Sequence, residues 1–429
     1  MTSLSPAGGQ VGTTFPVVLT GTPGKTPPAA WVDHPGIVFK TGPVAKATTY
    51  EVSVAADTPT GPHLIRFHND EGSALPRTFM VGTVPETTDA EPNDDARRTA
   101  QEVKTLPVTV NGKLDKTGDA DSFKVTLQEG RTFAAILHSY GLGTQVDPAL
   151  RLLDDQGTEL TLNHDGYNLD PVVSWEVKKT GTYVVQVMGF SHPPAAEVNL
   201  KGGADIVYRL TLTQDATARF AWPPGVKRGA KTPVQPLGWN CGPEMKGAAI
   251  DVDAPVSAVG SMAVMSSGPE PLHLALSDHD TVLELEPNDQ AATAPEVGLP
   301  AALQGVLQKA GDEDRFAFIA KKGQSYVFKV TSADLHAPLD AWLRIEDASG
   351  KMITQADDAK EANFDPTLTW KAPADGKYVI AMSDRFQRGD WDYVYHIDAS
   401  LGSETPQLAA TLAEHSLKLE AGKTAEIKV

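Results

Sequence analysis

An internal repeat constrains this chain more than any other feature of its sequence. The acidic run Asp89–Asp94 reads Asp-Ala-Glu-Pro-Asn-Asp, and 195 positions later Glu284–Asp289 reads Glu-Leu-Glu-Pro-Asn-Asp. A Gly-Asp-x-Asp-x-Phe run at Gly118–Phe123 is likewise matched by Gly311–Phe316. Matched spacing over about 115 residues indicates two copies of a whole domain rather than the short units of a solenoid. We refer to this repeated segment as unit B.

A second kind of segment, unit A, precedes each copy of unit B. The pattern Pro6–Gly12 followed by Val17–Gly21 is matched 217 positions later by Pro223–Gly229 and Val234–Gly238. The second unit A is shorter, because 57 residues separate Gly229 from Glu286 where 79 separate Gly12 from Glu91. We therefore expect the order A-B-A-B and then the start of a further, truncated β-domain, with the boundaries 1–84, 85–215, 216–282, 283–400 and 401–429.

Strand signals dominate the pattern of residues. The chain holds 37 Gly and 32 Pro, which favours short strands and many turns. Short β-branched and aromatic runs occur at Thr132–His138, Tyr183–Val187, Tyr208–Leu212, Ser325–Val330 and Tyr378–Met382. We predict an all-β protein of tandem antiparallel β-sandwiches. Helix is expected only as a turn after each Glu-Pro-Asn-Asp, such as Asp95–Ala100, capped by the preceding acids.

Composition limits the partners of the chain. The formal net charge of −18 and the pI near 5.0 disfavour nucleic acid and anionic membranes, which repel an acidic protein. No run of 18 apolar residues is present, so we expect no membrane insertion. Cys241 is the only cysteine, and the fold must therefore rest on packing or on metals. The N-terminus has no signal-peptide pattern, so the protein is either cytosolic or has its signal outside this sequence.

The motifs of unit B resemble those of the bacterial pre-peptidase C-terminal domain. The matching features are the opening Glu-Pro-Asn-Asp, the Gly-Asp-x-Asp-x-Phe run, an Asp-x-x-Gly hairpin and a late Gly-x-Tyr strand at Gly181 and Gly376. Unit A resembles immunoglobulin-like domains of the IPT/TIG type, most clearly at Pro6–Gly21 and Ala56–His63. The resemblances imply small sandwiches of secreted bacterial proteins, jelly-roll-like in unit B and immunoglobulin-like in unit A, which often flank a peptidase but also occur without one. Independently of them, Leu417–Val429 alternates apolar and polar residues on both sides of Gly422 and stops inside its second strand. We therefore expect a fragment of a longer protein, with a docked terminal hairpin as the alternative.

The repeated acids predict a calcium site in each unit B. Asp89, Glu91, Asn93 and Asp94 fall at spacings that place alternate oxygens on one side of an extended chain. Six hard oxygen donors suit Ca²⁺, which takes six to eight. The predicted ligands are Asp89, Glu91, Asn93, Asp94, Asp119 and Asp121 in the first copy, and Glu284, Glu286, Asn288, Asp289, Asp312 and Asp314 in the second.

The resemblance adds weight to this prediction. Collagen-binding domains of clostridial-type collagenases share the fold and bind calcium through an acidic N-terminal segment of similar spacing. The second copy fits that pattern better, because Asp89 stands where the second copy has Glu284. The alternative is that Asn-Asp caps a helical turn and that the Gly-Asp-x-Asp acids form Asx turns without any cation. The sequence leaves both interpretations open.

The sequence shows no catalytic motif. His-Glu-x-x-His, Gly-x-Ser-x-Gly and phosphate-loop patterns are absent. His164-Asp165 and Asp278-His279-Asp280 resemble fragments of acid–base pairs, but neither recurs in its sister unit. The paired acids could support glycoside hydrolysis, although their recurrence in both copies favours a role in the fold. We expect no catalytic centre in this chain.

Two further sets of residues follow from the repeat. The recurring aromatic residues are expected to form the cores: Phe123 and Phe316, Trp175 and Trp370, Tyr183 and Tyr378. The loops Met188–Pro194 and Phe386–Trp391 differ between the copies and are candidates for binding.

We expect a monomeric, non-catalytic extracellular protein of modular binding or structural type, stiffened by structural Ca²⁺. Its expected partners are an extracellular protein or a polysaccharide. The alternative is an accessory region, for substrate binding or targeting, of a larger secreted peptidase or other hydrolase. An enzyme in its own right is the third hypothesis, and it would depend on His164 or His279.

Overall fold

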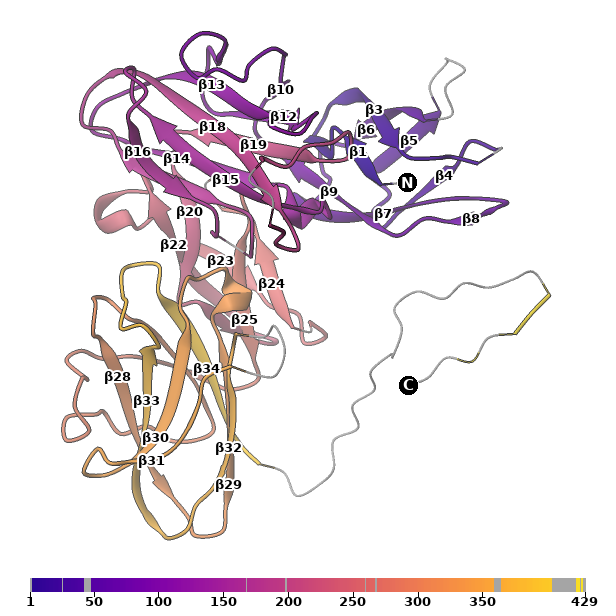
Figure 1. The fold of residues 1–429 in the computed structure, drawn as a ribbon. Coiled ribbons are helices and arrows are strands. Elements are labelled where there is room, and N and C mark those ends of the chain that lie inside the picture. Colours follow the sequence, from indigo (N-terminus) through magenta and orange to yellow (C-terminus); the bar gives the residue numbers. More distant parts are fainter. Residues whose placement is uncertain are drawn as a thin grey trace.

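The described part of the chain folds into four successive β-sandwiches, and Figure 1 shows the first two beside each other above the third and the fourth. A computed structural model describes residues 2–24, 26–41, 48–166, 168–196, 199–258, 260–266, 268–358, 364–402, 422–424 and 426. In these residues the helices are three short 3₁₀ turns, η1 (Tyr140–Leu142), η2 (Pro243–Met245) and η3 (Ala333–Leu335). The prediction of an all-β protein of tandem sandwiches is therefore confirmed. None of the described helices is long and apolar enough to cross a membrane.

The first sandwich consists of two four-stranded sheets. One sheet has the order β1 (Ser3–Ser5), β3 (Thr14–Thr20), β6 (Thr49–Val54), β5 (Ile37–Thr41). The other has the order β2 (Gly8–Gln10), β9 (Arg77–Gly82), β7 (Gly61–Asn69), β4 (Ala29–Val32), with β8 (Gly72–Ser73) paired to β7. Pairings are antiparallel except between β2 and β9.

The third sandwich repeats this arrangement with fewer strands. Its sheets have the orders β20 (Thr217–Trp222), β22 (Lys231–Trp239), β23 (Ile250–Asp253) and β21 (Gly225–Lys227), β25 (Leu272–Ser277), β24 (Ser261–Val264). Strand for strand, the pair that is missing corresponds to β4 and β5. Because the third sandwich lacks these two strands, the offset between matching residues of the repeats is 217 ahead of them and 195 beyond them.

The second and fourth sandwiches share one topology. In the second, the sheets have the orders β10 (Glu86–Thr88), β12 (Val108–Lys113), β19 (Val207–Thr213), β14 (Thr132–His138), β17 (Val172–Glu176) and β11 (Gln101–Glu102), β13 (Ala120–Leu127), β18 (Gly181–Ser191), β15 (Val146–Leu153), β16 (Glu159–Asn163). In the fourth, they have the orders β26 (Thr281–Leu283), β27 (Ala301–Val306), β34 (Val394–Leu401), β29 (Ser325–Thr331), β32 (Thr367–Lys371) and β28 (Glu313–Ala320), β33 (Gly376–Asp384), β30 (Ala341–Asp347), β31 (Met352–Ala356). A single parallel bridge between Glu296 and Ala317 stands in the place of β11.

The recurring aromatic residues lie in the cores of these two larger sandwiches, as predicted. Phe123 and Phe316 are fully buried, and Tyr183 and Tyr378 nearly so. Trp370 is buried, whereas its counterpart Trp175 is half-buried and packs against the edge of the core. The five strand runs predicted from sequence lie within β14, β18, β19, β29 and β33. Most of the predicted terminal β-domain, 401–429, lies outside the described residues.

The sandwiches contact one another through specific polar pairs as well as apolar surfaces. Asn240 of the third sandwich accepts a hydrogen bond from the Thr132 amide of the second at 3.0 Å and donates one to its carbonyl at 2.7 Å. The side chain of Gln304 in the fourth sandwich accepts one from the Gly225 amide at 2.8 Å. Figure 1 shows β20–β25 between the first two sandwiches and the last.

The buried aromatic core of the second sandwich makes a direct prediction about stability. Phe133 on β14 is fully buried, so Phe133→Ala should lower the free energy of unfolding by about 3–5 kcal/mol. Phe190 on β18 is 45% exposed, and Phe190→Ala should change it by less than about 0.5 kcal/mol. Urea unfolding followed by circular dichroism measures both. Equal effects of the two substitutions would contradict the assigned core.

Candidate metal centres

The two acidic runs of the second sandwich meet where the chain crosses from one sheet to the other. The first run follows β10, and Asp119 and Asp121 stand at the turn into β13 of the opposite sheet. Carboxylate oxygens of Asp89, Glu91 and Asp121 lie within 4.8 Å of one another. Oxygens of Glu91, Asp94 and Asp119 form a second such group. Residues that are distant in the sequence therefore converge on one point.

The fourth sandwich builds the same arrangement. Oxygens of Glu286, Asp312 and Asp314 lie within 4.8 Å of one another. Glu284 joins them through Tyr395, whose hydroxyl lies 3.4 Å from Glu284 and donates to Asp314 at 2.6 Å. Asp289 lies at the rim, where its Oδ1 accepts a long hydrogen bond from the backbone amide of Glu313.

Each acidic run contains a buried asparagine. Asn93 and Asn288 are fully buried, and among the described residues neither amide oxygen nor amide nitrogen has a hydrogen-bond partner. Burial of an unpaired amide is costly, and almost all buried polar groups in native proteins are paired. The same pattern in both repeats indicates that these side chains face a ligand of the folded protein.

The neighbouring aspartates divide their two oxygens between different partners. Oδ2 of Asp119 accepts a hydrogen bond from the Asp115 amide at 2.5 Å, and Oδ2 of Asp312 does the same with Gln308. The Oδ1 atoms of Asp119 and Asp312 are buried without a hydrogen bond. The turn-forming interpretation therefore accounts for one oxygen of each residue, and the other oxygen has only a lysine ammonium group 3.6 Å away.

The predicted helical turn has a different cap from the one expected. Oδ1 of Asp95 accepts hydrogen bonds from the amides of Arg97 at 2.9 Å and Arg98 at 3.2 Å. Asp95 therefore caps its own turn, and the prediction that Asn93 and Asp94 cap it is wrong. This frees the amide of Asn93 for the cluster, because a side chain that caps a turn cannot also point inward.

Burial and mutual repulsion disfavour the charged forms of these acids. Burial, with Asp89 and Asp119 nearby, raises the pKa of Asp121 to about 8. Burial also raises the pKa of Asp119 to about 6, and that of Asp314 well above its ordinary value. Ionised carboxylates at this density need a counter-cation or protons.

Sequence reasoning missed a tyrosine and a glycine that support each cluster. Tyr208 on β19 donates to Asp121 at 2.5 Å, as Tyr395 does to Asp314. A Cβ atom at Gly112 would lie 2.1 Å from the Tyr208 ring, and one at Gly305 would lie 2.2 Å from the Tyr395 hydroxyl. Only glycine leaves room for each tyrosine. The repeat could have revealed these glycines, because Gly112 and Gly305 each stand two residues after an apolar residue in corresponding strands.

A lysine at the rim of each cluster was missed as well. Nζ of Lys116 lies 3.6 Å from Asp119, and Nζ of Lys309 lies 3.6 Å from Asp312. These carboxylates raise the pKa of both lysines. The lysines supply one positive charge to each cluster of five acids. The matched Lys-x-Gly-Asp of the two repeats was the signal that could have found them.

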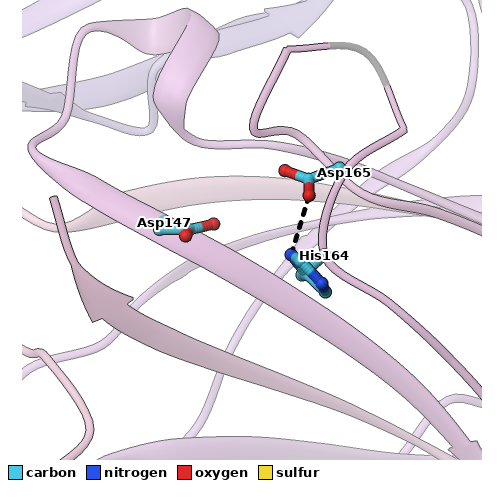
Figure 2. Close-up of side chains that lie close together, drawn as sticks. All are labelled: Asp147, His164 and Asp165. Atoms are coloured by element: carbon cyan, nitrogen blue, oxygen red, sulfur yellow. Dashed lines mark ion pairs between the residues drawn. The ribbon is translucent and has the colours of Figure 1, made fainter. Parts of the chain in front are cut away.

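The candidate acid–base residue His164 lies in a separate acidic group (Figure 2). Nδ1 of His164 lies 2.9 Å from Asp165, and Figure 2 shows Asp147 of β15 beside them. Both His164 and Asp165 are more than half exposed, so their pair is in water. Burial and the charge of Asp165 raise the pKa of Asp147. In the second repeat Asp340 and Asp358 stand at the positions of Asp147 and Asp165, and Asp357 stands at the position of the histidine.

The second candidate, His279, takes part in a contact between sandwiches. Its Nε2 lies 3.6 Å from Asp398 of β34, and its backbone amide donates to Ser277 at 3.0 Å. Asp278 and Asp280, on either side of it, pair with Arg228 and Lys227 of the third sandwich. This histidine therefore lies at a structural junction.

The two variable segments also differ from expectation. Met188–Ser191 belongs to β18 and pairs with β15, so only the end of the predicted loop Met188–Pro194 is a loop. In the other segment, Phe386 is 68% exposed, whereas Trp391 is half-buried and packs against Phe220 and Trp239.

Comparison with known proteins gives partial similarities. No protein-family model matches the chain. Over 114 residues it is 36% identical to a probable subtilase-type serine protease of Deinococcus radiodurans, a match that covers 25% of this chain and 15% of that protein. The chain thus matches only a small part of that relative's length.

Solved structures give likenesses of similar extent. The pre-peptidase C-terminal domain of a collagenase from Bacillus anthracis is 15% identical and covers 26% of this chain and 100% of that chain, with a TM-score of 0.20. The periplasmic lysozyme inhibitor PliG of Aeromonas hydrophila is 15% identical and covers 29% and 98%, also with a TM-score of 0.20. Each likeness has about the length of one larger sandwich.

The buried acids make the stability of the metal-free protein depend on pH. The pKa of Asp121 is about 8 in the folded chain, above the ordinary value of 3.8, so the folded state binds more protons than the unfolded state between these values. The free energy of unfolding should therefore fall as pH rises from about 4 to about 8. Melting in EDTA, followed by circular dichroism, should show a lower melting temperature at the higher pH.

A matched pair of variants tests the assignment. Asp121→Asn removes the titrating group and should weaken the pH dependence, whereas substitution of the exposed Asp57 by Asn should leave it unchanged. A melting temperature of the metal-free protein that rises over this pH range would contradict the assignment.

Proposed function

We propose that this chain is a non-catalytic binding or accessory region of a larger secreted or cell-surface protein, and that each larger sandwich holds a structural Ca²⁺. Residues 85–215 and 283–400 are assigned as pre-peptidase C-terminal-like domains, and 1–84 and 216–282 as IPT/TIG-like units. One observation carries the calcium assignment. The side-chain amides of Asn93 and Asn288 are each buried without a hydrogen bond, while their backbone amides donate to the carboxylates of Glu91 and Glu286.

The donor set fits calcium by its chemistry. Each cluster offers hard oxygens from five carboxylates and one amide, which is the ligand type and number that Ca²⁺ takes. The set contains no sulfur and no imidazole, so it does not suit Zn²⁺ or copper. The cation would be held by Asp89, Glu91, Asn93, Asp94, Asp119 and Asp121, and by Glu284, Glu286, Asn288, Asp289, Asp312 and Asp314.

A bound cation would supply structural support. Its positive charge would offset the burial and the mutual repulsion that raise the pKa of these acids. The ligands would come from the segment after β10 or β26 and from the turn into β13 or β28, so the cation would join the two sheets at the start of each larger sandwich. Because the arrangement is present twice, it suits a property of the fold better than a single catalytic centre.

The partial match to a subtilase-type protease supports the accessory alternative within this proposal. About a quarter of the chain matches a small part of a protein described as a protease. In this interpretation, the segment that the two proteins share is a domain beside the catalytic domain of the protease. In this interpretation the chain is monomeric and binds an extracellular protein or a polysaccharide on behalf of the larger protein.

The calcium proposal predicts a large thermal effect. Removal of Ca²⁺ with EDTA should lower the melting temperature by about 5–10 °C, and added Ca²⁺ should restore it. Saturation at about 100 times the dissociation constant contributes about 2.7 kcal/mol per site. Scanning calorimetry with metal-free buffer measures the shift, and native mass spectrometry counts the ions. An unchanged melting curve with no bound metal would overturn the calcium proposal.

Single substitutions separate the two sites. Asn93→Ala and Asn288→Ala should each remove one bound Ca²⁺ per chain, and the double variant should lose the response to EDTA. Asp95→Ala is the matched control, because Asp95 caps the turn next to the cluster through its own backbone contacts. It should lower the melting temperature equally with and without Ca²⁺. The second site is expected to bind Ca²⁺ more tightly, because Glu284 fits the calcium-binding pattern better than Asp89 does at the equivalent position.

A further inference from the structure

A cavity of about 310 Å³ lies at the junction between the third and fourth sandwiches. Its apolar lining comes from Trp222 at the end of β20, Trp391 before β34, and the side chains of Leu237, Met245 and Val306. Three of the seven tryptophans of the chain gather at this junction, because Trp239 packs edge-on against Trp391 with ring centres 5.9 Å apart. The cavity is therefore an aromatic site shared by two domains.

The first junction of the chain provides an internal comparison for Trp222. Ser5 pairs with Val18 in the first sandwich, as Trp222 pairs with Gln235 in the third, and both pairs are offset by 217 residues. A serine is therefore sufficient at this position for the fold.

The same comparison applies to Trp391. Gly202 and Gly389 occupy equivalent positions in the two copies, because each packs closely against a lysine carbonyl. Two residues further on, Ala204 therefore corresponds to Trp391. At the first junction, the Ala204 carbonyl accepts a hydrogen bond from Thr20 of the neighbouring sandwich at 3.4 Å. An alanine is sufficient there to join the two sandwiches. The two tryptophans are additions of the second junction, and they line an open cavity instead of filling it.

Polar side chains surround the mouth of this cavity. Glu244, Lys246 and Gln308 are exposed, and Nζ of Lys246 lies 3.4 Å from Glu244. Nε2 of Gln308 lies 3.5 Å from Glu284, which also lines the wall. The rim thus offers carboxylate and amide oxygens as acceptors and an ammonium group as a donor. Glu244 and Met245 have φ angles of 53° and 59°, a conformation that non-glycine residues seldom adopt.

We propose that this cavity binds one pyranose ring of a glycan. This inference rests on the proposed function as a binding or accessory region, and it names the class of ligand. The C–H face of a sugar ring packs on the face of an indole, and its hydroxyls both donate and accept hydrogen bonds, which suits a mixed rim of carboxylate, amide and ammonium groups. A volume of about 310 Å³ is at the lower end for ligand pockets and fits a single ring with part of its neighbour.

The test is a titration of the full chain with the tetrasaccharides of β-1,4-glucan, α-1,4-glucan, β-1,4-mannan and chitin. Isothermal calorimetry and saturation-transfer NMR should detect binding of at least one of them, with a dissociation constant on the order of 1 mM for a single-ring site. Trp391→Ala should weaken that binding by about three- to tenfold, the factor expected for loss of one stacking contact. Trp31→Ala should leave it unchanged, because Trp31 is 53% exposed on β4 of the first sandwich.

A second variant protects the test against misfolding, because Trp391 also packs against Phe220. Gln308→Ala removes a rim group without disturbing that packing and should weaken sugar binding several-fold. Absence of binding by all four sugars would overturn the proposal, as would equal binding by wild type, Trp391→Ala and Gln308→Ala. Binding of a proline-rich peptide in place of every sugar would overturn it too. Calcium stabilisation is read from the melting temperature, so failure of the two proposals is distinguishable.

Discussion

Each larger sandwich depends on a carboxylate buried between its two sheets. Asp121 begins β13 in one sheet and accepts a hydrogen bond from Tyr208 of β19 in the other, and Asp314 and Tyr395 form the same link. Burial of a charged group is tolerated only when a partner compensates it. The surrounding acids, the unpaired asparagine and the rim lysine are all arranged around that requirement. The glycine beside each tyrosine belongs to the same arrangement, because any side chain there would displace the phenol.

Much of the fold could be predicted from the sequence, because the repeat and the strand patterns are local signals. The core positions of Phe123 and Phe316 followed from recurrence in register. The site could be predicted only in part, because Tyr208 and Tyr395 come from a strand far along the chain and carry no motif of their own. The capping role of Asp95 was missed for another reason. Whether Asp94 or its neighbour Asp95 caps the turn depends on a shift of one residue, and no sequence pattern determines that shift.

Duplication gives this molecule an internal standard for separating fold from function. What recurs in both larger sandwiches, such as the acidic clusters and their tyrosines, is required by the architecture. What appears once, such as Trp222 and Trp391, replaces Ser5 and Ala204 at equivalent places without changing the way the domains meet. The exposed pair His164 and Asp165 also appears once, but both side chains are more than half exposed to water.

The absence of counterparts of β4 and β5 has a consequence for the order in which the protein is assembled. The third sandwich has only three strands in each sheet, and part of its apolar surface is covered by the fourth. Phe220, Leu237 and Ala275 complete their packing against Val306 and Val394, which are synthesised later. During translation from the N-terminus, the first two sandwiches can close as they emerge. The third must wait with an open face until β34, the last strand of the described residues, leaves the ribosome.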